Sequence, residues 1–155
     1  MTPAINLLER EGISHQVLSY QHEASAQSYG DEAVTKLNLC AEQVFKTLVV
    51  QLDNGTLAVA ITPVSSKLNL KQMAKSVRVK KVVMADKQRV EKTTGYVLGG
   101  VSPLGQKKRL PTVIDVSAEQ FDVIYVSAGK RGLEIGLSPT SLCALTQGSF
   151  ASITQ

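Results

Sequence analysis

The sequence predicts an α/β protein in which a mixed, mostly antiparallel β-sheet or β-barrel is flanked by helices. Short runs of β-branched residues recur along the chain, separated by segments with helical periodicity. The dipeptide Asn54-Gly55 lies between two such runs and is the strongest hairpin signal, so those strands are expected to pair antiparallel. Because strands and helices do not alternate strictly, a doubly wound parallel sheet is disfavoured.

The composition predicts a single globular domain spanning residues 1–155. Of these 155 residues, 43% are hydrophobic and 19% are charged. No apolar run approaches the roughly 20 residues that cross a membrane, and no signal peptide opens the chain. Cys40 and Cys143 stand alone, without the spacing of zinc ligands, so we expect free thiols and a cytoplasmic protein. A net charge of +4 permits a polyanionic partner without requiring one.

Capping residues predict where several helices begin, namely after Thr2, Asn69, Asp86 and Ser138. The expected helices are residues 3–12, 31–39, 70–77, 87–93 and 139–147. The expected strands are residues 15–20, 44–50, 56–62, 79–84, 96–98, 112–116 and 123–127, with a helical turn at 117–121 and a turn at 129–132 that leads into 133–137.

The strand at residues 44–50 carries a lysine on an apolar face. Successive side chains of a strand point to opposite faces, so Lys46 shares its face with Leu48 and Val50 while Thr47 points the other way. Lys46 is either a side chain that reaches back to solvent or a cation that meets an anion in a cleft. On this strand alone the first interpretation is favoured. Lys46 and Thr47 can line one pocket only if the strand bends or bulges.

Glycines are concentrated at residues 99–105, where backbone N–H groups could bind an oxyanion. The spacing from Gly100 to Gly105 is that of a P-loop. However, Gln106 and Lys108 replace the lysine and the hydroxyl residue that a P-loop requires, which excludes nucleotide triphosphate binding by this route. A glycine-rich turn without a ligand is the commoner case.

Basic residues are clustered in three segments, at residues 71–81, 107–109 and 130–131. A run of charge is usually only a solvated face. The three segments would form a phosphate-binding surface if the fold brought them together.

The usual catalytic arrangements are absent from the sequence. His15 and His22 lie in polar surroundings, where a surface role is favoured, and there is no GxSxG motif, no HExxH motif and no evident carboxylate pair. Ser127 ends a strand before a glycine turn, so its hydroxyl would either face a cleft or cap the turn. An enzyme with this sequence would lack an obvious general base.

Three motifs taken together resemble the YbaK/prolyl-tRNA-synthetase editing-domain superfamily. They are Phe45-Lys46-Thr47-Leu48, the segment GYVLGGVSPLG at 95–105 and the segment YVSAGKRG at 125–132, and the similarity extends over essentially the whole chain. The resemblance implies a mixed β-barrel flanked by helices, with no cofactor and no metal. It also implies hydrolysis of the ester between cysteine and the terminal ribose of tRNA(Pro), with tRNA(Pro) and prolyl-tRNA synthetase as partners and no membrane association.

The resemblance further implies roles for individual residues. Lys46, Gly99 and Gly100 would form the catalytic part of the site. The lysine would hold the phosphate or ribose of the tRNA 3′ end, and the glycines would present backbone groups to the aminoacyl moiety. Tyr29 stands where relatives are expected to carry Phe, which adds a hydroxyl to the pocket wall. The implied substrate-binding residues are Tyr20, Tyr29, Thr47, Ser102 and Ser127.

The implied mechanism needs no base from the protein, because the substrate cysteine's thiol attacks its own ester and leaves as a cyclic thiolactone. Proximity in such a reaction supplies up to about 7–11 kcal/mol. Two alternatives stay open: a non-catalytic tRNA- or synthetase-binding module of the same fold, and a deacylase for another small amino acid, such as one acting on Ala-tRNA(Pro). The presence of the whole residue set favours activity, whereas only pocket shape separates the possible amino acids.

Overall fold

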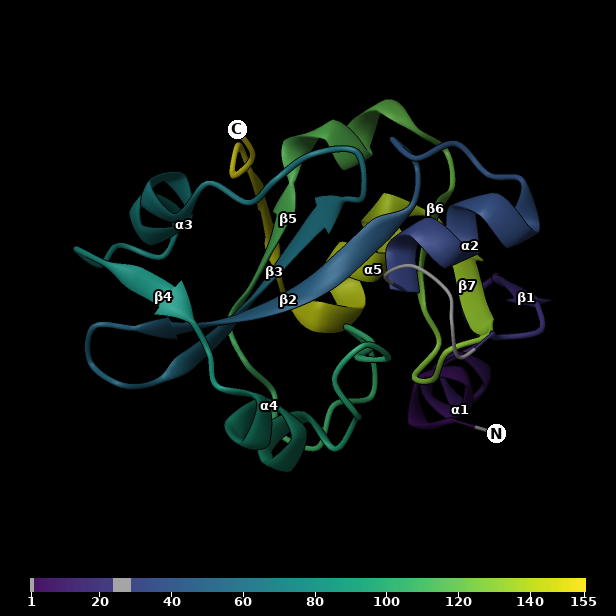
Figure 1. Ribbon diagram of the computed structural model, residues 1–155, viewed down its shortest axis with the longest axis horizontal. Coiled ribbons are helices and arrows are strands. Elements are labelled where there is room, and N and C mark those ends of the chain that lie inside the picture. The colour runs from purple at the N-terminus through teal and green to yellow at the C-terminus, as the bar shows by residue number, and fades with distance from the viewer. Residues whose placement is uncertain (1, 24–28) are drawn as a thin grey trace.

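The computed structural model describes residues 2–23 and 29–155, apart from the Tyr29 side chain (Figure 1). The helices are α1 (Pro3–Arg10), α2 (Tyr29–Leu37), α3 (Leu70–Ser76), α4 (Lys87–Thr94) and α5 (Pro139–Thr146), with a 3₁₀ helix at Val116–Gln120. The strands are β1 (Gln16–Ser19), β2 (Phe45–Leu52), β3 (Leu57–Pro63), β4 (Val82–Met84), β5 (Thr112–Asp115), β6 (Ile124–Ser127), β7 (Leu133–Leu137) and β8 (Ser149–Ala151).

The strands form two sheets, which confirms the mixed α/β class, although the sheets do not close into a barrel. One sheet has the order β1-β7-β6 and is antiparallel, and the other has the order β4-β2-β3-β5-β8. In the second sheet β3 pairs with β5 and β5 with β8 in parallel, while β2 is antiparallel to both of its neighbours. The isolated bridge between Val44 and Tyr125 joins the start of β2 to β6, so β2 connects the two sheets.

The β2–β3 hairpin forms where the sequence predicts it. The side chain of Asn54 accepts hydrogen bonds from the N–H and the hydroxyl of Thr56 (3.0 and 2.7 Å), and Gly55 adopts a φ of 89° that favours glycine. The pairing runs without interruption from Phe45 opposite Pro63 to Gln51 opposite Leu57. The hairpin therefore fixes which residues of β2 share a face.

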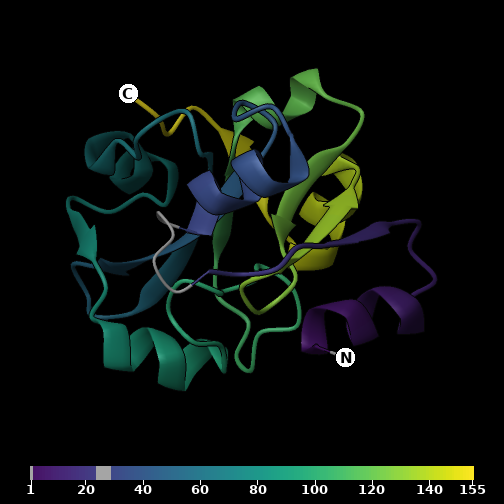
Figure 2. The ribbon, with the colours of Figure 1, turned by 45° about the vertical axis from the view of Figure 1, so that its right-hand side comes forward.

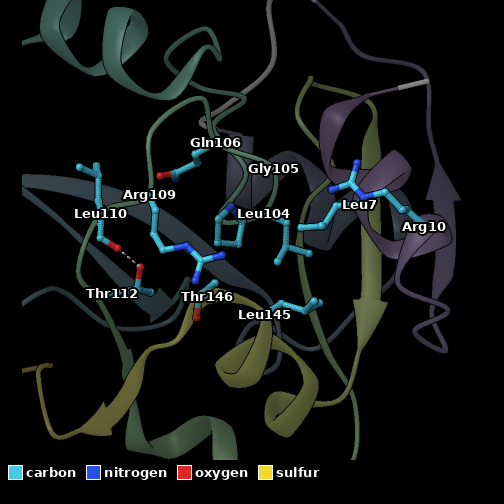
Figure 3. Close-up of a pocket in the computed structure, with 11 residues that line it drawn as sticks. Leu7, Arg10, Leu104, Gly105, Gln106, Arg109, Leu110, Thr112, Leu145 and Thr146 are labelled. Carbon is cyan, nitrogen blue, oxygen red and sulfur yellow. Dashed lines mark hydrogen bonds between the residues drawn. The ribbon is translucent and has the colours of Figure 1, made fainter.

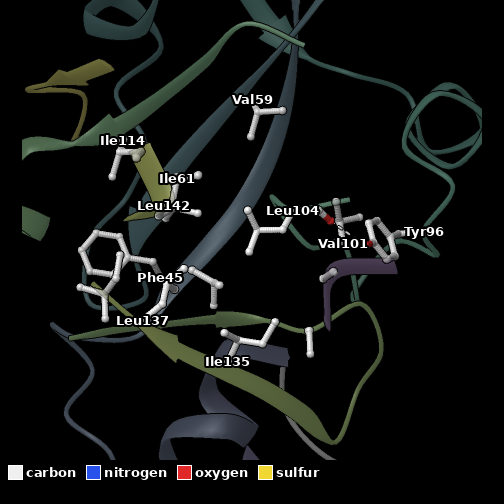
Figure 4. Close-up of a cluster of buried hydrophobic side chains, with 14 of the residues drawn as sticks. Phe45, Val59, Ile61, Tyr96, Val101, Leu104, Ile114, Ile135, Leu137 and Leu142 are labelled. Atoms are coloured by element: carbon white, nitrogen blue, oxygen red, sulfur yellow. Dashed lines mark hydrogen bonds between the residues drawn. The ribbon is translucent and has the colours of Figure 1, made fainter. Parts of the chain in front are cut away.

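β2 and β3 separate two hydrophobic cores. Phe45 and Val49 lie in the larger core, which Figure 4 shows with Val59, Ile61 and Leu137, whereas Val50 lies in a smaller core with Met73 of α3. The alternation predicted for residues 44–50 is thus confirmed. All residues of β3 are buried because both of its faces are covered.

The predicted N-caps are confirmed. The side chains of Thr2, Asn69 and Ser138 each accept a hydrogen bond from the backbone N–H three residues later in the chain, at 3.3, 3.1 and 3.0 Å. The Asp86 carboxylate accepts from the N–H groups of Gln88 and Arg89. These caps fix where the helices start against the sheets. Both views place α3 and α4 beside β4 at one end of the molecule and α1 beside β1 at the other (Figures 1 and 2). None of the helices in the described part of the chain is long and apolar enough to span a membrane.

The prediction of a strand at residues 96–98 is wrong. Gly95 ends α4 in the left-handed conformation, and the N–H of Leu98 donates to the Glu91 carboxylate (2.8 Å), so this segment turns back on the helix. The side chains of Val97 and Leu98 are 71% and 52% exposed. The β-branched composition of the segment predicted a core strand, but no neighbouring strand pairs with it in the described structure. Strand β8, conversely, was not predicted.

Candidate functional site

A cavity of about 420 Å³ opens beside the middle of β2. Its walls come from β2, the start of α2, the loop after α4 and the turn before β7. Apolar side chains alternate with cations around it. The lining residues are Gly30, Asp31, Lys46, Thr47, Leu48, Val64, Leu98, Gly99, Val101 and Arg131.

Lys46 and Thr47 line this cavity together without a bulge, because the cavity lies along an edge of the strand. The N–H of Leu52 donates to the carbonyl of Thr56, just before β3 (2.8 Å). Every second residue from Leu52 back to Lys46 therefore directs its N–H and C=O toward β3. Thr47 turns its N–H and C=O to the opposite edge. There β4 pairs with Val50 to Leu52 and the N–H of Ala85 donates to the carbonyl of Val49, while the bridge to β6 is at Val44, just before β2 begins. The expected bend or bulge is therefore not needed.

Lys46 is a partly buried cation without an ion pair in the described structure. Burial lowers the pKa of its ammonium, the positive charge of Lys67 lowers it further, and Asp31 opposes that shift. The residue lines the cavity and is partly exposed. Of the two interpretations of Lys46, this geometry favours a cation that awaits an anionic ligand.

Thr47 presents a buried hydroxyl that has no hydrogen-bond partner within residues 2–23 and 29–155. Its backbone N–H and C=O also face the open edge of β2. A polar group buried without a partner costs roughly 1–3 kcal/mol. The residue thus offers three polar groups at the cavity wall to whatever binds there.

The glycine loop forms the opposite wall. Gly99 lines the cavity with a φ of 93°, and the nearest atom to an added Cβ would be Arg131 Nε at 3.7 Å. Gly100 is buried behind it, where a Cβ would lie 3.1 Å from Lys130 Cα and 3.4 Å from Arg131 N. The absence of a side chain at Gly100 therefore lets the loop pack directly on the turn that carries Arg131.

Beneath α2, one face of the three-stranded sheet carries polar side chains. Tyr20, Ser127 and Glu134 share this face, because Glu134 pairs with Ser127 on one side and with Leu18, two residues before Tyr20, on the other. Figures 1 and 4 show α2 on the side of β6 and β7 that points away from the main core. Glu134 is fully buried, neither of its oxygens has a partner among the described residues, and burial raises its pKa to about 8.

Glu32 of α2 belongs to the same polar layer. It is 3% exposed, and its carboxylate is 2.7 Å from Nδ1 of His22 and accepts from the N–H of Glu23 (2.9 Å). Burial by itself would raise the pKa of Glu32, but these hydrogen bonds hold it below its ordinary value. His22 is exposed, in agreement with its predicted surface position, and its ring also ties the segment after β1 to α2.

The two predicted serines stabilise turns and do not line the cavity. Ser127 Oγ accepts from the N–H of Gly129 (3.0 Å), which is the turn-capping alternative. Ser102 Oγ accepts from the N–H of Leu104 (3.2 Å), and Ser102 is completely buried. The predicted contact of Tyr29 falls on a side chain outside the described part of the chain.

The structure thus brings Lys46, Thr47 and Gly99 together at one cavity, with Gly100 buried behind Gly99, whereas Tyr20 is not among the lining residues. Sequence reasoning did not identify Glu134, Glu32 or Asp31 as site residues. A glutamate that alternates with apolar residues in a strand ordinarily points to solvent, so the sequence carried no signal that α2 would bury Glu134. Arg131 was recognised only as part of a basic turn.

The three basic segments do not share one hollow. Lys71, Lys80 and Lys81 line one between α3 and β4, Lys108 and Arg109 line another beside α4, and Arg131 belongs to the cavity at β2. Among the described residues, no group of three or more His, Cys, Asp or Glu side chains is placed to hold a metal ion. Cys40 and Cys143 are free thiols.

Residues 23–145 match the family model described as "Aminoacyl-tRNA editing domain". The chain therefore belongs to this family, and its function is of the aminoacyl-tRNA editing class, as the resemblance of the three motifs implied.

Relatives support the assignment over the full length. The chain is 38% identical over 154 residues to the Enterococcus faecalis protein named "Putative Cys-tRNA(Pro)/Cys-tRNA(Cys) deacylase EbsC", covering 99% of this chain and 93% of that protein. It is 21% identical to the Bacillus subtilis "Uncharacterized protein YwhH", over 79% of this chain and 76% of that one.

Solved structures share the fold. A "putative trans-editing enzyme for prolyl tRNA synthetase" superposes with a TM-score of 0.86 at 23% identity, covering 99% of this chain and 95% of that one. The "hypothetical protein APE2540" gives a TM-score of 0.88, also at 23% identity, over 99% of both chains.

Proposed function

We propose that this protein is a free-standing, single-domain deacylase that hydrolyses mischarged Cys-tRNA(Pro). The observation that carries the proposal is the cavity at the open edge of β2, a small, partly apolar chamber lined by Lys46, which forms no ion pair with the described residues. The cation suits a phosphate or ribose of the tRNA 3′ end. The apolar wall formed by Leu48, Val64 and Val101 suits a short side chain such as that of cysteine.

The proposed reaction uses the substrate's own nucleophile. The cysteine sulfur bonds to its ester carbonyl carbon, the bond from that carbon to the ribose oxygen breaks, and the thiol proton ends on the released ribose hydroxyl. The cyclic thiolactone then reacts with water to give free cysteine. The protein's part is to hold the ester in this conformation and to stabilise the developing negative charge with N–H groups and cations.

Within the site, Lys46 holds the tRNA end, and Thr47 and Gly99 present polar groups to the aminoacyl ester. Gly100 fixes the loop, and Tyr20, Ser102 and Ser127 support the substrate-binding walls. No base is assigned to the protein. The partners of the protein in the cell are tRNA(Pro) and prolyl-tRNA synthetase, and the reaction takes place in the cytoplasm.

A deacylation panel tests the proposal. Cys-, Ser-, Ala- and Pro-charged tRNA(Pro), together with Cys-tRNA(Cys), are incubated with the enzyme and the remaining ester is followed over time. Rapid loss of Cys-tRNA(Pro) and much slower loss of Ser-tRNA(Pro) is expected, since a hydroxyl is a poorer nucleophile than a thiol.

Other outcomes identify the alternatives. Equal rates for cysteine and serine point to a water activated by the protein, and preference for Ala-tRNA(Pro) points to a different amino acid. Retention of tRNA on a filter without any deacylation identifies a binding module.

A further inference from the structure

A second cavity, of about 200 Å³, lies on the far side of the glycine loop from the site at β2. It is enclosed by α1, the segment that follows Pro103 and the end of α5 (Figure 3). Leu98, Gly99 and Val101 line the first cavity, whereas residues 103–106 and 109–110 line this one. The two cavities have no lining residue in common.

The lining of this second cavity holds two arginines, Arg10 and Arg109, and no acidic residue. Figure 3 shows Arg109 extending across the opening toward Thr146 and Arg10 reaching from α1 beside Leu7. Arg109 forms no ion pair with the described residues. Among the described residues Arg10 pairs with the neighbouring Glu11, at 3.9 Å with both side chains more than half exposed, and such a contact holds the guanidinium weakly.

This cavity offers N–H donors from two guanidinium groups and one amide, while its two threonine hydroxyls, whose hydrogens are already used, can only accept. The hydroxyls of Thr112 and Thr146 already donate to backbone carbonyls (3.0 and 2.9 Å). The Gln106 amide donates one hydrogen to Ser102 O (3.0 Å) and keeps a second, and the two guanidinium groups retain theirs. A ligand here must therefore accept several hydrogen bonds and carry negative charge.

We propose that this cavity binds a phosphate group. Guanidinium matches the tetrahedral oxygens of phosphate in a bidentate manner, and two such groups approach the space from separate elements. Leu7, Leu104 and Leu145 form the apolar part of the lining, and the space of about 200 Å³ is large enough for a phosphate group, whose ester substituents would lie outside it. The phosphate comes either from an RNA backbone or from a free phosphate ester, and the first source rests on the proposed function.

A titration with inorganic phosphate tests the site directly. The Nε–H resonances of the arginine side chains are followed by ¹⁵N NMR, and those of Arg109 and Arg10 are expected to shift in the wild type. Arg109→Gln is expected to weaken binding about tenfold or more. Lys108→Gln is the matched control, because it removes the same charge from the adjacent residue, which lines a different hollow. Absence of a shift in the wild type, or an equal loss in Lys108→Gln, overturns the proposal.

The source of the phosphate is identified with an acceptor-stem RNA minihelix that carries no amino acid. Its binding is followed by fluorescence anisotropy, and no reaction takes place. Weaker minihelix binding by Arg109→Gln, with Lys108→Gln unchanged, assigns the phosphate to RNA. Unchanged minihelix binding together with lost phosphate binding assigns it to a free ester. Neither readout depends on deacylation, so a failure here is distinguishable from a failure of the proposed function.

Discussion

Tyr20 and Glu134 lie on the same face of the three-stranded sheet, two pairing positions apart, and neither side chain has a hydrogen-bond partner for its buried oxygens in the described structure. Tyr20 is opposite Gly132, to which it is joined by a backbone hydrogen bond of 2.9 Å. Burial raises the pKa of the Tyr20 hydroxyl, and the charges of Glu134 and Glu32 raise it further. Buried polar groups without partners are costly, so their position behind the candidate site indicates a functional constraint.

Stability is expected to fall with rising pH because of Glu134. Its carboxyl has an ordinary pKa of 4.5 in the unfolded chain and one of about 8 in the folded protein. Between these values the folded protein holds a proton that the unfolded chain has released, so the stabilisation is complete below pH 4.5 and is lost as the pH rises to 8. Urea unfolding of the wild type should show a loss on the order of 2–4 kcal/mol between pH 5 and pH 8.

Glu134→Gln removes this titration and should flatten the pH dependence, leaving the variant more stable than the wild type at pH 8. Glu42→Gln, on an exposed turn, is the matched control and should retain the wild-type slope. The same slope in Glu134→Gln and the wild type would contradict the assignment.

Lys46→Ala is expected to reduce deacylation of Cys-tRNA(Pro) by at least about a hundredfold, the range seen when one preorganised charged contact is removed from a transition state. Circular dichroism should remain native, because the side chain forms no ion pair in the described structure. Lys75→Ala, on the exposed face of α3, controls for the loss of positive charge. Near-normal activity of Lys46→Ala would refute the role of this lysine.

Thr47→Val and Thr62→Val form a matched pair on one hairpin. Both hydroxyls are buried without partners, so each valine should leave stability unchanged or raise it by up to about 1–2 kcal/mol in thermal or urea unfolding. Only Thr47 lines the cavity, so only Thr47→Val should lower kcat/KM. Equal activities of the two variants would mean that the Thr47 hydroxyl does not contact the substrate.

Gly100→Ala should impair activity more than stability. The new Cβ would meet the backbone of Lys130 at 3.1 Å, and the loop would have to move by a few tenths of an ångström away from the turn that carries Arg131. We expect a decrease of about tenfold or more in kcat/KM, since misplacement of positioning groups by 1 Å costs up to about 10²-fold, with a modest decrease in melting temperature. Wild-type kinetics would show that the contact tolerates a methyl group.

Local chemistry predicted much of the fold. The caps at Thr2, Asn69 and Asp86 and the turn at Asn54-Gly55 act over a few residues, so the sequence alone identifies them. The two faces of β2 follow from alternation. The parallel pairing of β3 with β5 joins segments far apart in the chain and leaves no local mark. Val97 and Leu98 have strand-like composition, yet α4 and the glycines around them impose a turn.

The candidate site was predictable to a smaller extent. Lys46 stood out because a cation on an apolar face is unusual, and the glycines stood out by their density. The burial of Glu134 depends on α2, which packs across a sheet that is separate from β2. The cavity itself depends on where β4 and β6 pair along β2, because these strands leave part of its edge uncovered. Those pairing positions are set only when the sheets assemble.

The open stretch of β2 lies in the seam where the two sheets part, and a single bridge, Val44 to Tyr125, joins β2 to β6. The width of the cavity is therefore set by the angle at which the sheets diverge from that bridge. On the proposed function, the amino acid that fits the cavity would then depend on how the two sheets are placed as well as on the lining side chains. Core substitutions around Val44 can then alter which amino acid is accepted while every lining side chain stays the same.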